Sequence, residues 1–112
     1  MELTGEAFKN SPTCEGVAFA DSEAPNDMAK IEIKGRYPES GWAFNEAAHE
    51  MVFVARGIGS LAIKGEDVIS LSEGRAASVA PGKRFAWEGD MTLIMSCSPP
   101  FNPNQYKVEE NS

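Results

Sequence analysis

The stretch Glu50-Met51-Val52-Phe53-Val54-Ala55-Arg56-Gly57 decides the fold class of this chain. Successive side chains of a β-strand point to opposite faces of the sheet, so this stretch predicts a strand that ends at a glycine. Glu50, Val52 and Val54 then share one face, whereas Met51 and Phe53 share the other. The stretch therefore predicts a half-buried strand that carries one carboxylate on the same face as two valines.

Similar apolar-rich runs recur along the chain, with glycine or acidic residues between them. Residues 30–34 also alternate with a period of two, which predicts that Ile31 and Ile33 face the core. Glycines interrupt every candidate helical stripe. The pattern therefore predicts an antiparallel sandwich or barrel with six further short strands, at 50–55, 58–63, 67–71, 76–80, 84–87 and 91–97.

The length of 112 residues predicts a single domain with one core. Residues 1–27 contain several turn-favouring pairs and are expected to form an N-terminal arm with one short strand near 17–20. Residues 28–107 are expected to form the barrel, and residues 108–112 a tail.

Two glycine-containing segments predict hairpin turns, at 64–67 and 88–90, because glycine accepts the positive φ of tight turns. After Cys97 the prolines prevent a central strand. This last segment is expected to wrap across the outside of the barrel, with Phe101 and Tyr106 as anchors.

The charge balance bears on the class of partner. Acidic residues outnumber basic ones by 17 to 10, the net charge is −7, and no basic stripe is present, so nucleic acid is not an expected partner. No apolar run approaches the roughly 18 residues of a membrane-spanning helix, and residues 1–6 do not resemble a secretory signal. We therefore expect a cytoplasmic protein without membrane contact. Cys14 and Cys97 lack zinc or redox spacing and are expected to be reduced thiols.

The glutamate and glycine positions resemble the cupin superfamily, in particular its small single-domain members. Glu50 and Gly57 match the last two positions of that family's first motif, and Gly74 and Gly82 match glycines of its second motif, with Pro81 displaced by one residue. The resemblance covers roughly residues 30–107. It implies an all-β fold, a cupin-type antiparallel β-barrel or jelly roll, with few or no helices.

The chain departs from the cupin pattern at the metal-binding histidines. The two histidine positions of the first motif fall on Phe44 and Glu46, or on Ala43 and Asn45 if the spacing is one residue longer. The histidine position of the second motif falls on Phe85. None of these positions holds a histidine.

The remaining donors predict a protein without a metal or another cofactor. Glu50 alone of the four cupin ligands is kept, and the single histidine, His49, adjoins it on the strand and points to the opposite face. A hard cation, magnesium or calcium, held by Glu46 and Glu50 is the alternative.

If the cupin alignment holds, several side chains line an apolar, aromatic pocket with one or two acids, which suits a small organic or sugar-like ligand. The predicted ligand-binding set is Trp42, Phe44, Glu46, Glu50, Phe85, Trp87 and Met95, with Leu93 as an alternative to Met95. Two alternatives stay open. The aromatic side chains instead fill the barrel, or Glu50 lies at the barrel mouth, where it is solvated or paired with one of the basic residues Arg36, Arg56, Lys83 and Arg84.

Three functions follow from these alternatives. The leading hypothesis is a metal-free barrel that binds a small ligand through Glu50 and Glu46. The second is an isomerase or lyase in which burial raises the pKa of Glu50, so that it acts as a general acid and base. The third is a structural module with a filled barrel. Because Met51 and Phe53 point outward, a homodimer is also expected, unless the N-terminal arm covers them.

Overall fold

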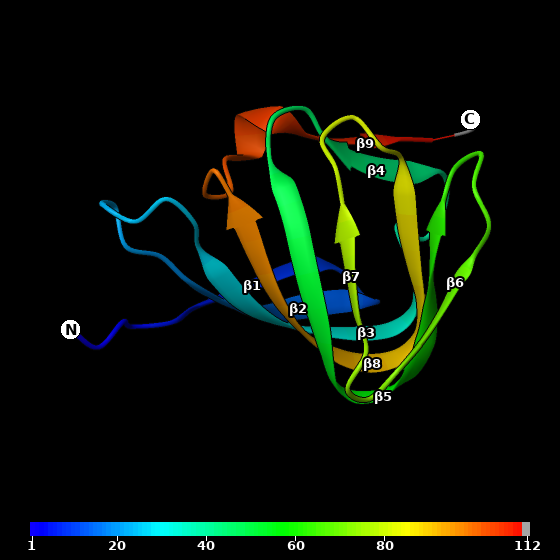
Figure 1. The fold of residues 1–112 in the computed structure, drawn as a ribbon, viewed down its shortest axis with the longest axis horizontal. Coiled ribbons are helices and arrows are strands. Elements are labelled where there is room, and N and C mark those ends of the chain that lie inside the picture. The colour runs from blue at the N-terminus through cyan, green and yellow to red at the C-terminus, as the bar shows by residue number, and fades with distance from the viewer. Residues whose placement is uncertain (111–112) are drawn as a thin grey trace.

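The computed structural model describes residues 1–110, which form nine strands and one short 3₁₀ turn, Pro103–Gln105. The strands belong to a single curled antiparallel sheet (Figure 1). The all-β prediction is confirmed. The strands are β1 (Glu6–Ser11), β2 (Cys14–Phe19), β3 (Met28–Tyr37), β4 (Trp42–Asn45), β5 (His49–Ile63), β6 (Ile69–Ser72), β7 (Ala76–Val79), β8 (Phe85–Ser98) and β9 (Tyr106–Glu109).

Strand β8 is the central strand of the sheet. It pairs with β3 on one side and with the whole length of β5 on the other. The long strands β3, β5 and β8 curve so strongly that β4 and β9 cross the open end of the sheet (Figure 1). The inner faces of these strands form the buried core, which includes Ile31 and Ile33 as predicted.

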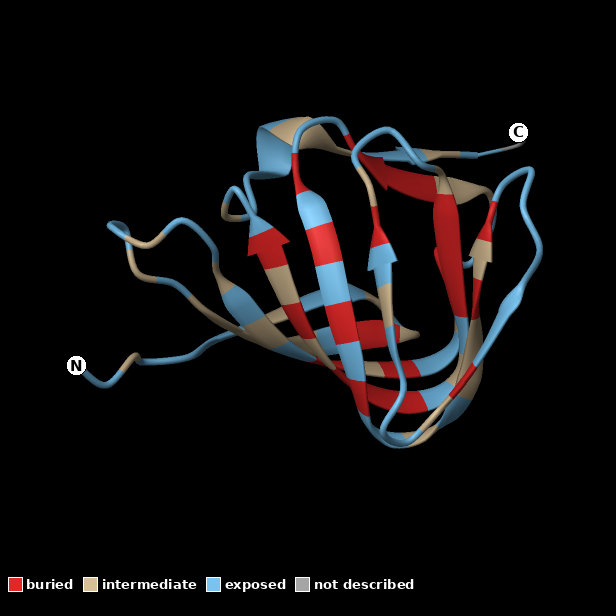
Figure 2. Ribbon diagram, in the orientation of Figure 1, coloured by how far each residue is buried: buried red, intermediate tan, exposed pale blue. Residues whose placement is uncertain are grey.

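Strand β5 shows the predicted alternation (Figure 2). Glu50, Val52 and Val54 are buried, whereas Met51 and Phe53 keep exposed fractions of 63% and 47%. The N-terminal residues do not cover these two side chains, because β1 and β2 extend the sheet beyond β3 instead. Met51 and Phe53 therefore form an exposed apolar strip.

The predicted strands 50–55 and 58–63 are one strand, β5, which bends at an irregularity in its pairing with β8 between Val54 and Arg56. Gly57 follows this irregularity with a φ of 93°, and a Cβ there would lie 2.0 Å from the carbonyl oxygen of Asp90. Only glycine fits both the backbone conformation and the close approach. This requirement explains the glycine in the motif.

Two predictions about turns have different outcomes. Residues 64–67 connect β5 to β6 as a hairpin turn, as predicted. The predicted turn at 88–90 is wrong, because these residues lie inside β8, which joins the predicted strands 84–87 and 91–97. There Gly89 has a φ of 136°, and a Cβ on it would lie 2.5 Å from the Cα of Gly59, so this glycine serves a close backbone approach and not a hairpin.

The two ends of the chain contain more strand than predicted. Residues 1–27 hold two strands and not one, because β1 and β2 form a hairpin that pairs with β3. At the other end β9 pairs with β4, and Phe101 packs on Tyr106 with ring centroids 5.5 Å apart. Of the predicted tail 108–112, residues 111–112 lie outside the described residues.

Within residues 1–110 no helix has the length and hydropathy needed to cross a bilayer. The absence of nucleic-acid and membrane partners and the cytoplasmic location stay predictions.

Candidate functional site

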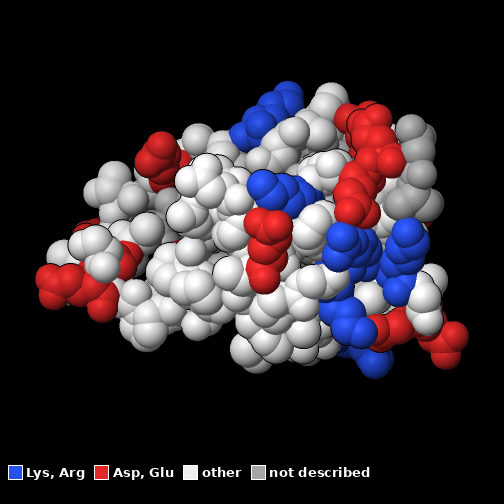
Figure 3. All heavy atoms as spheres, turned by 90° about the horizontal axis from the view of Figure 1, so that it is seen from above, with Lys and Arg blue, Asp and Glu red and all other residues white. Residues whose placement is uncertain are grey.

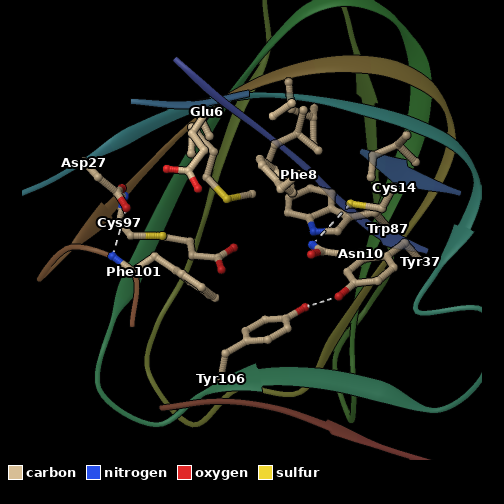
Figure 4. Close-up of a pocket in the computed structure, with 18 of the residues that line it drawn as sticks. Glu6, Phe8, Asn10, Cys14, Asp27, Tyr37, Trp87, Cys97, Phe101 and Tyr106 are labelled. Carbon is tan, nitrogen blue, oxygen red and sulfur yellow. Dashed lines mark hydrogen bonds between the residues drawn. The ribbon is translucent and has the colours of Figure 1, made fainter. Parts of the chain in front are cut away.

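The barrel contains a partly open cavity of about 440 Å³. Residues from β1, β2, β3 and β8 form most of its wall (Figure 4). Strands β5 and β9 each contribute one residue, Glu50 and Tyr106. A volume of this size accommodates a small organic molecule. The hypothesis of a filled barrel is therefore wrong for this structure, because the aromatic side chains line a space and do not occupy it.

Four of the seven predicted ligand-binding residues line this cavity: Glu50, Phe85, Trp87 and Met95. The rings of Phe85 and Trp87 meet edge to face, with centroids 6.1 Å apart. Leu93, the alternative to Met95, lines the cavity as well. Strands β5 and β8 thus bring together the predicted acid and most of the predicted aromatic wall.

The other three predicted residues, Trp42, Phe44 and Glu46, do not line the cavity. The guanidinium of Arg36 lies 5.5 Å from the Trp42 ring centroid, and that of Arg84 lies 3.7 Å from the Phe44 ring centroid. Glu46 is exposed. All three residues precede β5: Trp42 and Phe44 belong to the short strand β4, and Glu46 lies in the loop after it. In such short segments, period-two alternation alone does not predict which way a side chain faces.

Glu50 is the buried acid of the site, with an exposed fraction of 3%. The amide nitrogen Nδ2 of Asn45 donates a hydrogen bond of 2.6 Å to Glu50 Oε2, and Oε1 has no hydrogen-bond partner among the described residues. Burial raises the pKa of Glu50 from 4.5 to about 7, although the Asn45 hydrogen bond opposes the increase. Glu50 can therefore gain or lose a proton near neutral pH.

The basic residues proposed as partners of Glu50 contact other groups. Arg56, Lys83 and Arg84 form ion pairs with acidic residues elsewhere, and Arg36 donates to the carbonyl oxygens of Pro38 and Gly41. The alternative of an ion-paired Glu50 is therefore wrong.

Asn45 is held in a defined orientation by Gln105. The Gln105 side chain donates to Asn45 Oδ1 at 2.7 Å, and its own Oε1 accepts from the backbone N–H groups of Ala47 and Ala48. The N–H of Gly82 donates to the carbonyl oxygen of Asn45 at 2.7 Å. Asn45 must therefore present its N–H group to Glu50. The sequence offers one signal for Asn45: when the spacing of the first cupin motif is taken as one residue longer, Asn45 stands at a histidine position.

A pair of phenols lies in the same cavity. The hydroxyl groups of Tyr37 (β3) and Tyr106 (β9) are 2.6 Å apart and point toward each other (Figure 4). Burial raises the pKa of both phenols, and the charge of Glu50 contributes to the increase. Both therefore stay protonated at neutral pH. One hydroxyl proton serves their mutual hydrogen bond, and the other is free to be donated to a ligand.

Two free thiols, Cys14 and Cys97, complete the polar lining. Burial raises the pKa of Cys14 to about 11 and raises that of Cys97 as well. The charge of Glu50 contributes to both increases, which places the thiols within its electrostatic reach. They are therefore neutral and poorly nucleophilic at neutral pH.

The metal site of the cupin pattern does not fit these residues. No group of three or more His, Cys, Asp or Glu side chains within residues 1–110 is arranged to hold a metal ion. His49 is exposed, on the opposite face of β5 from Glu50. Glu46 lies outside the cavity and does not join Glu50 there.

No protein-family model matches the chain, and no curated protein matches its sequence. Among solved structures, the nucleoside dehydratase Pac13 has a TM-score of 0.84 at 15% identity, over 98% of this chain and 91% of that chain. Ectoine synthase from P. lautus has a TM-score of 0.71 at 11% identity, over 93% and 81%. KdgF from Halomonas sp. has a TM-score of 0.65 at 17% identity, over 88% and 91%. These likenesses show that the chain has a cupin-type fold.

Proposed function

We propose that this chain binds a small organic molecule in the barrel cavity and catalyses proton transfer on it, as a metal-free isomerase or lyase. The observation that carries the proposal is Glu50 Oε1, a buried carboxylate oxygen without a partner among the described residues, in a residue that lines an open cavity. A buried acid with a pKa near neutrality is suited to general acid–base catalysis.

The first step common to both reaction types uses groups already in place. The Glu50 carboxylate takes a proton from a carbon next to a carbonyl group, and the electron pair of that C–H bond moves into the forming enolate. The free phenol proton of the Tyr37–Tyr106 pair donates a hydrogen bond to the enolate oxygen, which stabilises the developing charge.

The fate of the proton then decides the product. If the deprotonated carbon carries a hydroxyl group, the hydroxyl proton passes to the enolate oxygen and Glu50 returns its proton to the former carbonyl carbon, so that the carbonyl group moves by one carbon and the substrate is isomerised. If Glu50 gives the proton to a departing hydroxyl group, the C–O bond breaks and water and an unsaturated product are released. Asn45 stays bound to Oε2, which leaves Oε1 to carry the proton in both cases.

The solved structures favour a reaction of this kind. Pac13 is described as a nucleoside dehydratase, and Streptomyces variants of it, with a tyrosine replaced by phenylalanine or a histidine by glutamine, were solved with uridine. Dehydration is a lyase reaction that needs proton transfer. A cupin-type barrel of similar size is thus compatible with elimination chemistry.

The direct test is proton exchange in D₂O, followed by NMR with a panel of small hydroxy ketones and hydroxy aldehydes, with and without an amino group. The protein is expected to exchange protons next to the carbonyl group, or to release water, for at least one member of the panel. Exchange that never exceeds the buffer rate across the panel would contradict the proposal.

The phenol pair gives a second prediction. Tyr106→Phe removes one of the two hydroxyls, so the remaining hydroxyl of Tyr37 loses its bound partner and its fixed direction. We expect kcat in the exchange assay to fall by about tenfold to a hundredfold, with a smaller change in KM. Phe101→Leu, which also alters the wall but removes no hydroxyl, is the control. Equal losses of kcat in both variants would rule out a specific role for the phenol.

We also propose that the exposed strip of Met51 and Phe53 is the contact surface of a homodimer. Both side chains are exposed on the outer face of β5, and an apolar strip of this kind favours self-association. Phe53→Glu is expected to weaken association at least tenfold in sedimentation equilibrium. Val68→Glu changes another exposed apolar residue and should leave association intact. A wild-type protein that sediments as a monomer at high concentration would contradict the homodimer proposal.

A further inference from the structure

The charges around the cavity are all of one sign. Three carboxylates, Glu6, Asp27 and Glu50, are among the lining residues, whereas none of the Lys, Arg or His residues within the described chain lines it. Figure 4 shows Glu6 and Asp27 toward the same side of the cavity. An anionic ligand would therefore enter a site without a counter-charge, at a high desolvation cost.

Three of the ten basic side chains form ion pairs away from the cavity. Figure 3 shows Lys and Arg side chains interspersed with Asp and Glu on one face of the molecule. Arg56, Lys83 and Arg84 each form an ion pair, with N–O distances of 2.9, 2.7 and 2.8 Å. These basic side chains are thus neutralised locally, and none of them is a lining residue.

Asp27 and Glu50 differ in how many of their carboxylate oxygens accept a hydrogen bond. Asp27 accepts hydrogen bonds from the backbone N–H groups of Cys97 and Phe101, at 2.8 and 2.9 Å. Glu50 has one oxygen bound to Asn45 and one buried oxygen without a partner among the described residues. A buried, unpaired carboxylate oxygen is costly, and a ligand that donates a hydrogen bond or a positive charge to it would remove the cost.

The aromatic wall suits the same kind of ligand. Phe8, Trp87, Phe101 and Tyr106 all line the cavity. Aromatic rings attract organic cations through their electron-rich faces, and they also hold the apolar part of a ligand. The combination of carboxylates with aromatic rings is the chemistry by which proteins bind ammonium groups.

From these observations we propose that the ligand of this cavity carries an amino group that binds as an ammonium ion, and that anions are rejected. The inference rests on the proposed function only in using the same cavity, and it names the substrate class of that site. The ammonium group lies on the side of the cavity that holds Glu6 and Asp27, within the field of the Glu50 carboxylate, so that Glu50 Oε1 stays open to the carbon-bound proton. The apolar body of the ligand lies against the aromatic wall. Carboxylates and phosphate esters fall outside the class.

The test compares three probes of nearly equal shape: benzylamine, benzyl alcohol and benzoate. Binding to the full-length protein is measured by NMR titration at pH 7.5 and low salt. Benzylamine is expected to bind at least about tenfold more tightly than benzyl alcohol, and benzoate more weakly than either. Benzoate binding as tight as that of benzylamine, or no binding of benzylamine at millimolar concentration, would overturn the proposal.

Two substitutions separate a local charge effect from the net charge of the chain. Glu6→Gln removes one lining carboxylate and is expected to reduce the preference for benzylamine over benzyl alcohol by about threefold. Glu73→Gln removes the same charge from the turn between β6 and β7, which does not line the cavity, and should leave the preference unchanged. If both variants lower the preference equally, the preference for benzylamine comes from the net charge of the chain and not from the carboxylates that line the cavity.

The binding test is independent of turnover. A protein that prefers benzylamine but catalyses no proton exchange would refute the proposed reaction and support the ammonium ligand. A protein that catalyses exchange but binds benzoate as well as benzylamine would support the reaction and overturn the ligand class.

Discussion

Glu50→Gln is expected to lower the rate of proton exchange at pH 8 by about 100-fold to 10,000-fold, the range by which a positioned general base accelerates proton transfer. Glutamine has nearly the same shape and can still accept the hydrogen bond from Asn45, but it cannot take a proton from carbon. In the wild-type protein the rate should rise with pH through the Glu50 pKa of about 7, because the carboxylate is the active form.

Glu46→Gln is the matched control, since Glu46 is exposed and lies outside the cavity. Its exchange rate and its pH profile should equal those of the wild type. Circular dichroism and thermal unfolding of both variants test whether the fold is intact. A Glu50→Gln protein that is folded and retains wild-type turnover would remove Glu50 as the base and, with it, the proposed mechanism.

How far the sequence predicts this site depends on the kind of evidence that each residue offers. The alternation of β5 and β8 predicts that Glu50, Phe85 and Trp87 face inward, because every second residue of a strand shares a face. It cannot predict Tyr37, Tyr106 or Cys14, whose strands are joined to the site only by long-range pairing. Those residues become recognisable when the order of strands in the sheet is known.

The cavity could not be predicted from the sequence for a different reason. Whether large side chains fill a barrel depends on the balance between its volume and the summed volumes of the inward residues. Here the β1–β2 hairpin extends the sheet beyond β3, and small residues such as Ala7, Ala18 and Ala29 line part of the wall. The turn-favouring pairs in residues 1–27 predict an arm with one short strand, and this pattern does not indicate that a hairpin there contributes to the wall.

Glu50 also makes the stability of the fold depend on pH in an unusual direction. The pKa of Glu50 is about 7 in the folded protein and 4.5 without burial. Between these values the folded state holds a proton that the unfolded state has released, so the free energy of unfolding falls as pH rises. The stabilisation is fully present below pH 4.5 and is lost once pH passes about 7. Its size is about 3 kcal/mol.

Glu50→Gln should remove this dependence, because the glutamine side chain is neutral at every pH. Urea unfolding at pH 5 and at pH 8 is expected to show that the variant gains stability relative to the wild type by about 2 to 3 kcal/mol as pH rises. Glu46→Gln, which changes an exposed carboxylate, should follow the wild-type curve. If Glu50→Gln also runs parallel to the wild type, Glu50 is ionised in the folded protein at both pH values, and burial does not hold its proton.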